Sequence, residues 1–174
     1  MGFEFRPCEF EMDYEAYMRF LLQHDSELNL PYAFGMKFSF IGSPLFLGKA
    51  MLVFAEEPYE VVGAAGFVYG TGAHGYEDRE VCQVEVACIR PEYRSVTLFR
   101  DGLKALVDLI RASNPDVQRL QFWTKADHGR LDRLFAKFGA LPGATRSDVN
   151  DLTCYVVPFP ALEQYCRRMY RHNE

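Results

Sequence analysis

The chain has 174 residues, and its 19 Lys and Arg against 24 Asp and Glu give a formal net charge of −5 and a pI near 5.4. This length predicts one domain, residues 1–174, with a core large enough to need no disulfide or metal. The hydrophobic share of 49% excludes a disordered chain, and the acidic balance argues against nucleic acid or an anionic membrane surface as a partner. Aromatic residues reach 15%, a high share that a core or a ligand-facing surface must account for.

The cysteines and the N-terminus indicate the compartment. The five cysteines are scattered and contain no C-x-x-C pair, so we expect reduced thiols, and the histidines and cysteines show no zinc-ligand spacing. The first residues lack the pattern of a secretory signal, and no apolar run approaches the length of about 18 residues that a membrane span needs. We therefore expect a cytoplasmic protein without a metal site.

In chain order, the hydrophobic pattern predicts the elements β, α, α, β, β, β, α, β, α, β, α. A short strand from Phe3 to near Cys8 precedes a helix whose apolar residues recur at helical spacing: Tyr14, Tyr17, Met18, Leu21 and Leu22. Residues 28–48 mix proline, glycine and five aromatics, and are predicted as a second short helix with loops. From Met51, two strands follow on either side of a turn at Glu57-Pro58.

The next strand, "REVCQVEVACI", alternates in character. Strand periodicity predicts Gln83, Glu85 and Ala87 on one face, and on the other face Cys82, Val84, Val86 and Cys88. A helix after Pro91 has its apolar stripe at Phe99, Leu103, Leu106 and Ile110. The strand "VQRLQFWT", a helix with the stripe Leu131, Leu134, Phe135 and Phe138, the strand "LTCYVVPF" and a short helix complete the chain. The fold class is α/β: a single-domain, mixed, largely antiparallel sheet flanked by helices.

The segment from Glu80 to Ser113 is the most informative for function. A strand there runs through a turn into a helix, whose first backbone N–H groups form a natural anion site with phosphate as the expected guest. Four basic residues gather here: Arg90, Arg94, Arg100 and Lys104. The alternative is that they solvate a helix face and pair with Glu92, Asp101 and Asp108.

Two segments, "IRPEYRSVTLFRDGLKAL" and "ADHGRLDRLFAKFGA", resemble motifs of the GCN5-related N-acetyltransferase (GNAT) superfamily. The segment that begins at Ile89 resembles the acetyl-CoA motif, in which a strand ends in Val-x-Pro-x-Tyr-Arg before a glycine-rich turn. The segment that begins at Ala126 is similar to the motif Asn-x-x-Ala-x-x-Leu-Tyr-x-Lys-x-Gly-Phe. The element order agrees with that family over nearly the whole chain, so the resemblance implies an acyl-CoA N-acyltransferase-like fold with acetyl-CoA as cosubstrate.

The resemblance also implies which residues bind acetyl-CoA. The strand ending at Ile89 would be splayed from its neighbour, and the backbone of Ala87, Cys88 and Ile89 would pair with the pantetheine arm. A backbone N–H near Ile89 would stabilise the oxyanion. His128 would contact the cofactor at a position where the family often has Asn. The pyrophosphate loop would comprise Arg94, Ser95, Val96, Thr97, Leu98 and Phe99.

That loop departs from the family pattern. Thr97 and Phe99 occupy its two small-residue positions, and Ser95 stands where another glycine is common. Glycine at such positions allows phosphates to approach the backbone closely. Thr97 and Ser95 could still contribute hydroxyl and amide donors, whereas Phe99 either narrows the site or belongs to the core.

For catalysis, the expected acceptor is an amine of a small molecule or peptide, whose ammonium must lose a proton before attack. Glu85 is the candidate base, with Gln83 positioning a water; the alternative is that Glu85 faces solvent and is balanced by Arg79 or Arg119. The family's Tyr that protonates the leaving thiolate corresponds to Phe135, a predicted core residue. The loss costs only ~2 kcal/mol, because a thiol of pKa about 8.5 leaves readily near neutral pH.

The sequence therefore predicts an N-acyltransferase that moves an acetyl group from acetyl-CoA to an amine by direct attack. One alternative is a non-catalytic GNAT-like domain that binds a ligand or protein and has lost CoA binding. Another is a small-molecule binder that uses residues 28–48 without CoA. Five aromatics of that segment would line an acceptor pocket, cover the sheet or join two copies in a homodimer: Tyr32, Phe34, Phe38, Phe40 and Phe46.

Overall fold

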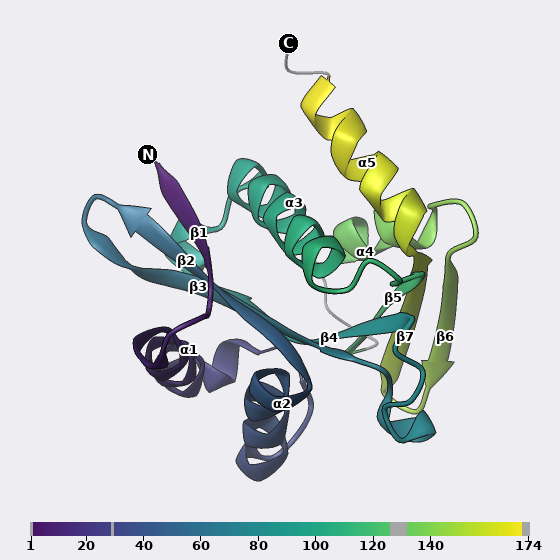
Figure 1. Cartoon of the computed structure of the whole chain (residues 1–174), viewed down its shortest axis with the longest axis horizontal. Coiled ribbons are helices and arrows are strands. Elements are labelled where there is room, and N and C mark those ends of the chain that lie inside the picture. Colours follow the sequence, from purple (N-terminus) through teal and green to yellow (C-terminus); the bar gives the residue numbers. More distant parts are fainter. Residues whose placement is uncertain (1, 29, 126–131, 172–174) are drawn as a thin grey trace.

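The computed structural model describes residues 2–28, 30–125 and 132–171. Seven strands form one sheet in the order β1-β2-β3-β4-β5-β7-β6, with helices on both of its faces (Figure 1). Neighbouring strands are antiparallel except β4 and β5, which run parallel. The predicted α/β fold, with a mixed and largely antiparallel sheet, is confirmed.

The strands are β1 (Phe3–Pro7), β2 (Gly48–Glu56), β3 (Tyr59–Tyr69), β4 (Val81–Ile89), β5 (Arg119–Lys125), β6 (Thr145–Val149) and β7 (Leu152–Pro158). The α-helices are α1 (Glu11–Gln23), α2 (Phe34–Leu47), α3 (Val96–Ser113), α4 (Asp132–Gly139) and α5 (Phe159–Arg171). Single 3-10 turns form η1 (Asp25–Glu27), η2 (Gly72–His74) and η3 (Pro91–Tyr93).

Strand β6 is an element that the sequence pattern does not predict. Its five residues, Thr145–Val149, are all exposed and pair only with β7, at the edge of the sheet. An edge strand without a buried face carries no apolar alternation, so its sequence resembles that of a loop.

Helix α2 is longer than the sequence suggests. Residues predicted as a short helix with loops form a continuous helix of 14 residues, despite Gly35, Gly42 and Pro44. The helix lies against β2, β3 and β4, and buries Ile41 and Pro44 there. Packing on the sheet outweighs the low helix propensity of these residues.

The helices divide the core into two main layers. Helices α1 and α2 cover one face, where their buried Tyr17, Leu21 and Ile41 pack with Leu52 and Val86 in what we call the α1–α2 core. Helices α3 and α5 cover the opposite face (Figure 1). With α4, they form the α3 core, which includes Phe67, Cys82, Leu106, Ile110, Phe138, Phe159 and Leu162.

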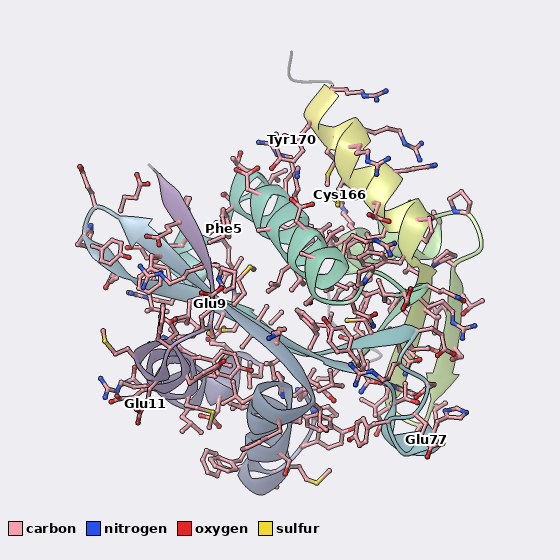
Figure 2. All side chains as sticks on the ribbon, in the orientation of Figure 1. Phe5, Glu9, Glu11, Glu77, Cys166 and Tyr170 are labelled. Carbon is pink, nitrogen blue, oxygen red and sulfur yellow. The ribbon has the colours of Figure 1, made fainter. Side chains whose placement is uncertain are left out.

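Particular side chains of β1 and α5 contact the first turns of α3. Phe5 of β1 points toward α3 (Figure 2), and a Cβ placed on Gly102 of α3 would lie 3.5 Å from its ring. Tyr170 of α5 donates a hydrogen bond of 2.6 Å to Asp101 of α3, and Cys166 is buried one turn earlier in α5. These contacts hold the first turns of α3 against β1 on one side and against α5 on the other.

A β-bulge in β4 corrects the predicted division of its side chains between the faces. Gly66 of β3 pairs with Val86 and Phe67 pairs with Val84, so Glu85 has no partner in β3. An extra residue shifts the alternation by one. The sequence pattern predicts Cys82, Val84, Val86 and Cys88 on one face. In the structure, Cys82 and Val84 pack in the α3 core, whereas Val86 and Cys88 pack in the α1–α2 core on the opposite face.

The bulge lies where both helices of the α1–α2 core approach the sheet most closely. A Cβ on Gly66 would lie 2.4 Å from the hydroxyl oxygen of Tyr17 and 2.7 Å from Cγ of Pro44. The Tyr17 hydroxyl also donates a hydrogen bond of 2.8 Å to the carbonyl of Ile41, which links α1 to α2 above this point. No side chain fits at Gly66 without moving α1 or α2.

We therefore expect Gly66→Ala to lower the free energy of unfolding by about 1–3 kcal/mol through overpacking. Urea unfolding followed by circular dichroism would measure the change. Gly42→Ala is the matched control, because a Cβ there meets nothing within 4 Å and alanine favours the helix by about 0.5–1 kcal/mol. Equal effects of the two substitutions would contradict the role assigned to Gly66.

Candidate functional site

The candidate site begins where β4 and β5 separate. Their parallel pairing joins Val81–Val84 to Arg119–Phe122 and extends no further in the described residues. Beyond Val84, β4 continues to Ile89 in register with β3, while β5 continues to Lys125 in register with β7. The splay that the GNAT resemblance implies for this strand is therefore present.

The backbone of β4 beyond the bulge faces two directions. The N–H of Arg90 donates 2.9 Å to the carbonyl of Val62 in β3. Because antiparallel backbone groups alternate in direction, Cys88 also faces β3, whereas Ala87 and Ile89 face the side from which β5 has diverged. Of the three residues expected to meet the pantetheine arm, only Ala87 and Ile89 direct their backbone groups toward the divergence.

The start of α3 follows closely in the chain. Ser95 is the N-cap, and its Oγ accepts a hydrogen bond of 3.0 Å from the N–H of Leu98. The side chains of Val96 and Thr97 are exposed, while Leu98 is fully buried. The exposed first turn of an 18-residue helix therefore presents backbone N–H groups at its positive end.

The ring of Phe99 belongs to the core. It is half-buried and packs against Phe138, with ring centroids 6.4 Å apart. Of the two alternatives for this residue, the structure favours a packing role. Leu98 likewise packs its side chain among Val53, Ala55 and Val62.

The four basic side chains near the start of α3 all have carboxylate partners. Arg100 pairs with Asp101 at 3.1 Å and Lys104 with Asp108 at 2.6 Å. Arg90 lies 3.0 Å from Glu60 and also pairs with Glu92. The alternative in which these cations pair with nearby carboxylates is therefore the one observed.

Arg94 connects three segments. Its Nε donates 2.9 Å to the carbonyl of Ile89, and its terminal nitrogen lies 2.9 Å from a carboxylate oxygen of Glu27 in η1. The side chain remains about half exposed. Arg94 thus joins the end of β4 to the connection between α1 and α2.

Glu85 is the bulged residue and is only 8% exposed. Burial raises the pKa of its carboxyl to about 7, although a hydrogen bond of 3.3 Å from Nε2 of Gln83 opposes that shift. Arg119 pairs instead with Glu80 at 3.6 Å, and the Arg79 guanidinium lies over the ring of Tyr69. The alternative of a solvent-facing Glu85 balanced by either arginine is wrong.

Gln121 extends this polar group and was not identified from the sequence. Its Nε2 donates 2.8 Å to Oε1 of Gln83, so the Gln83 amide presents its NH₂ group to Glu85. The signal was its position in β5: Gln121 lies next to Gln83 in the parallel register, on the same face. A chain of hydrogen bonds therefore runs from β5 to the buried carboxyl.

The remaining predicted residues lie in or near α4. Phe135 packs 5.3 Å from Phe122 and 5.6 Å from Tyr155, so its predicted core role is confirmed. His128 lies outside the described residues. Within the described ranges, no group of three or more His, Cys, Asp or Glu could hold a metal ion, and no helix is long and apolar enough to cross a membrane.

The aromatic side chains of residues 28–48 separate into two groups. Tyr32 and Phe40 stack with centroids 5.4 Å apart and are half-buried against the α1–α2 core. Phe34, Phe38 and Phe46 are exposed on α2. Tyr32 and Phe40 therefore help to cover the sheet, which was one of the three roles considered for these aromatics.

The raised pKa of Glu85 predicts a pH dependence of stability. The folded carboxyl binds its proton more tightly than the unfolded one, whose pKa is near 4.5. The free energy of unfolding should therefore fall, by up to about 3 kcal/mol, as pH rises from about 4.5 to about 7, and then level off. Glu85→Gln should remove this decline in urea unfolding, whereas Glu92→Gln, at an exposed carboxyl, should retain it. A decline that persists in Glu85→Gln would contradict the assignment.

The orientation of Gln83 predicts the effect of changing Gln121. In Gln121→Glu, the new carboxylate can only accept, so the Gln83 amide must turn and present its oxygen to Glu85. Loss of a donor and a nearby negative charge should raise the pKa of Glu85 further, by about one unit. Carbon-13 NMR of labelled glutamate side chains would measure it, with Glu85→Gln assigning the resonance. Gln121→Met should raise the pKa of Glu85 less than Gln121→Glu does. An unchanged pKa in Gln121→Glu would contradict the hydrogen-bond chain from Gln121 through Gln83 to Glu85.

Comparison with known proteins identifies the fold. No protein-family model and no curated protein matches the sequence. Among solved structures, the Escherichia coli ribosomal-protein-S18-alanine N-acetyltransferase is 13% identical, with 91% of this chain and 94% of that one covered at a TM-score of 0.60. An acetyltransferase of the GNAT family from Streptococcus pneumoniae is 15% identical, with coverages of 89% and 96% and a TM-score of 0.57. A chimeric spermidine N-acetyltransferase from Vibrio cholerae and hSSAT is 11% identical, with coverages of 93% and 98% and a TM-score of 0.59. The chain therefore has the fold of the GNAT superfamily.

Proposed function

We propose that this protein is an acyl-CoA-dependent N-acyltransferase that moves an acetyl group from acetyl-CoA to a primary amine. The observation that carries the proposal is the buried carboxyl of Glu85, located directly beyond the last paired residue of β4 and β5. The acetyltransferase names of the similar structures support it.

The chain offers backbone groups that fit acetyl-CoA. Ala87 and Ile89 direct peptide groups toward the divergence of the strands, where the amides of a pantetheine arm can pair with them. The exposed first turn of α3, at Val96 and Thr97, can receive phosphate oxygens. Arg94 contributes positive charge between the end of β4 and the first turn of α3, although it also forms an ion pair with Glu27.

Proton removal from the amine is the task assigned to Glu85. A base with a pKa of about 7 is about half ionised at neutral pH, and its carboxylate binds a proton more strongly than that of an ordinary glutamate. Glu85 takes the ammonium proton, directly or through a water held by Gln83. The neutral amine nitrogen then bonds to the thioester carbonyl carbon, and the N–H of Ile89 stabilises the oxyanion that forms. As the oxyanion collapses and the carbon–sulfur bond breaks, the nitrogen loses its second proton, which passes through water to the departing thiolate.

The attack is direct in this proposal, without an acyl-cysteine intermediate. Cys88 lies on the same strand, but its side chain is buried in the α1–α2 core and burial raises the pKa of its thiol to about 11. Such a thiol forms little nucleophilic thiolate at neutral pH. Phe135 cannot protonate the departing thiolate, which therefore leaves as the anion and takes its proton from water.

A non-catalytic GNAT-like domain is the second candidate. One observation favours it: the four basic side chains that could meet phosphates already have carboxylate partners. Thr97 and Phe99 at the small-residue positions point the same way. Binding of acetyl-CoA distinguishes this candidate from the enzyme.

Acetyl-CoA at about 100 times its dissociation constant should add about 2.7 kcal/mol to the stability, a rise of roughly 5–10 °C in Tm. ATP at the same concentration should give a smaller shift, since it lacks the pantetheine arm. Ala87→Pro removes one N–H that faces the divergence and leaves the ladder with β3 in place, so it should keep the ligand-free Tm but lose most of the shift. No shift at millimolar acetyl-CoA would favour the non-catalytic domain.

Glu85→Gln should reduce turnover by about 10²–10⁴-fold while the Kd for acetyl-CoA stays nearly unchanged. Release of the CoA thiol in the presence of a panel of primary amines would measure turnover. In the unsubstituted protein, kcat/KM should rise with pH through about 7 as Glu85 ionises. Full activity in Glu85→Gln would assign proton removal to water or to another group.

A further inference from the structure

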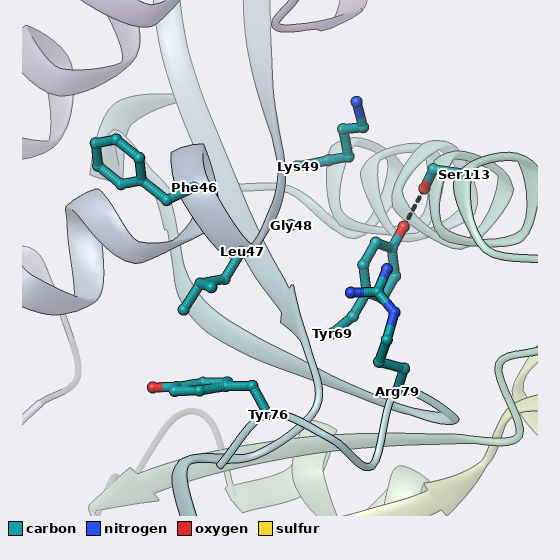
Figure 3. A pocket seen from close by; sticks show the side chains of 8 residues that line it. All are labelled: Phe46, Leu47, Gly48, Lys49, Tyr69, Tyr76, Arg79 and Ser113. Carbon is teal, nitrogen blue, oxygen red and sulfur yellow. Dashed lines mark hydrogen bonds between the residues drawn. The ribbon is translucent and has the colours of Figure 1, made fainter.

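A surface cavity of about 350 Å³ lies at the end of the sheet opposite the divergence of β4 and β5 (Figure 3). It is formed by the junction of α2 with β2, the end of β3, the connection from β3 to β4 and the last residue of α3. Ser113, at the end of the 18-residue helix α3, lies about 26 Å from Val96 at 1.5 Å per residue. The cavity is therefore distinct from the proposed acetyl-CoA site, and its volume falls in the range of small-molecule sites, about 300–1,000 Å³.

Two cations line this cavity, and the structure describes no carboxylate within ion-pair distance of either. They are Lys49 and Arg79, and no Asp or Glu is among the lining residues. Neither cation has an ion-pair partner in the part of the chain that the structure describes, in contrast to the paired cations at the start of α3. In a chain of net charge −5, two unpaired cations at one cavity favour an anionic guest.

The polar wall is held rigidly. Oγ of Ser113 donates 2.7 Å to the carbonyl of Leu109, so the hydroxyl of Tyr69 donates to Ser113 in the hydrogen bond between them. The Arg79 guanidinium lies 5.3 Å above the centre of the Tyr69 ring. Tyr69 is 5% exposed, so its position is fixed, and the stacked guanidinium of Arg79 is held with it. The planar edge of the guanidinium, with its N–H donors, can then bind a carboxylate.

The rest of the lining is apolar and aromatic. In the view of Figure 3, Phe46, Leu47 and Tyr76 lie to the left of the polar side chains. Phe46 is 88% exposed, so its ring is available for contact with a ligand. Cations on one side and exposed rings on the other match a molecule that carries both a negative group and an apolar body.

The backbone at Tyr76 is also unusual. Its φ is +62°, in the left-handed region that bulky residues rarely adopt. The conformation is held by a hydrogen bond of 2.9 Å from its N–H to the carbonyl of Thr71, and by Gly70, where a Cβ would lie 2.7 Å from Tyr76. Strained residues of this kind concentrate at ligand sites, and here the strain brings an aromatic ring to the cavity.

We propose that this cavity binds a small organic anion of the aromatic carboxylate class. Arg79 and Lys49 hold the carboxylate, and the aromatic body lies against Phe46 and Tyr76. The site is independent of acetyl-CoA and of the proposed transfer reaction.

Phenylacetate is a suitable probe, in a ¹H–¹⁵N NMR titration of the full chain. Saturable shifts are expected at the amides of Gly48, Tyr76 and Ser113. Phenylacetamide, which lacks the charge, and acetate, which lacks the ring, should each bind at least about tenfold more weakly, equivalent to about 1.4 kcal/mol. No saturable shift up to about 10 mM phenylacetate, or shifts confined to Ala87 and Val96, would overturn the proposal.

Three variants complete the test. Arg79→Gln and Phe46→Ser change exposed side chains for which the structure describes no hydrogen bond, so both should fold, and each should weaken phenylacetate binding about tenfold. Arg19→Gln, an exposed arginine on α1, should bind phenylacetate as the unsubstituted protein does. Equal binding by Arg79→Gln and Arg19→Gln would show that the cavity does not recognise the carboxylate.

Discussion

At Gly66 the hydroxyl of Tyr17 and the ring of Pro44 occupy the space that any side chain would need. Two helices therefore reach the backbone of β3 at one point, and across the ladder from that point β4 carries its extra residue. Several features of the molecule depend on this close approach. It seats α1 and α2 on the sheet, and it lies beside the bulge that turns Val86 and Cys88 into the core beneath them.

The same bulge decides the chemistry of Glu85. A glutamate on a regular half-exposed strand would keep an ordinary pKa, because water solvates its charge. Glu85 instead has no partner in β3, is 8% exposed, and has Gln83 as its hydrogen-bond donor. Desolvation outweighs that single neutral donor, so the carboxyl holds its proton to near neutral pH.

The two ends of the sheet differ in how their positive charges are balanced. Near the start of α3, the four basic side chains each form an ion pair with a carboxylate, and Arg94 also donates a hydrogen bond to the carbonyl of Ile89. At the opposite end, Lys49 and Arg79 line a cavity to which the described residues contribute no acidic side chain. The number of basic residues in the sequence favours the start of α3 as the anion site. The positions of the carboxylates, which only the structure shows, favour the cavity at Lys49 and Arg79 instead. Ion pairs at the surface contribute little to stability, but they determine which cations remain available to a ligand.

Local pattern was sufficient for most of the architecture. The strands and helices with a clear apolar face, such as the stripe of α3, were predictable, and so was the α/β class, because those signals are carried by neighbouring residues. Strand β6 and the full length of α2 were not, since the first has no buried face and the second is stabilised by the sheet rather than by its own residues. The facing of β4, the burial of Glu85, its relay through Gln121 and the pairing of Arg94 with Glu27 were decided by tertiary structure. Each depends on a contact between segments distant in the chain: periodicity can place a residue on a strand, but only the packing of other segments against it sets its partners and its exposure to water.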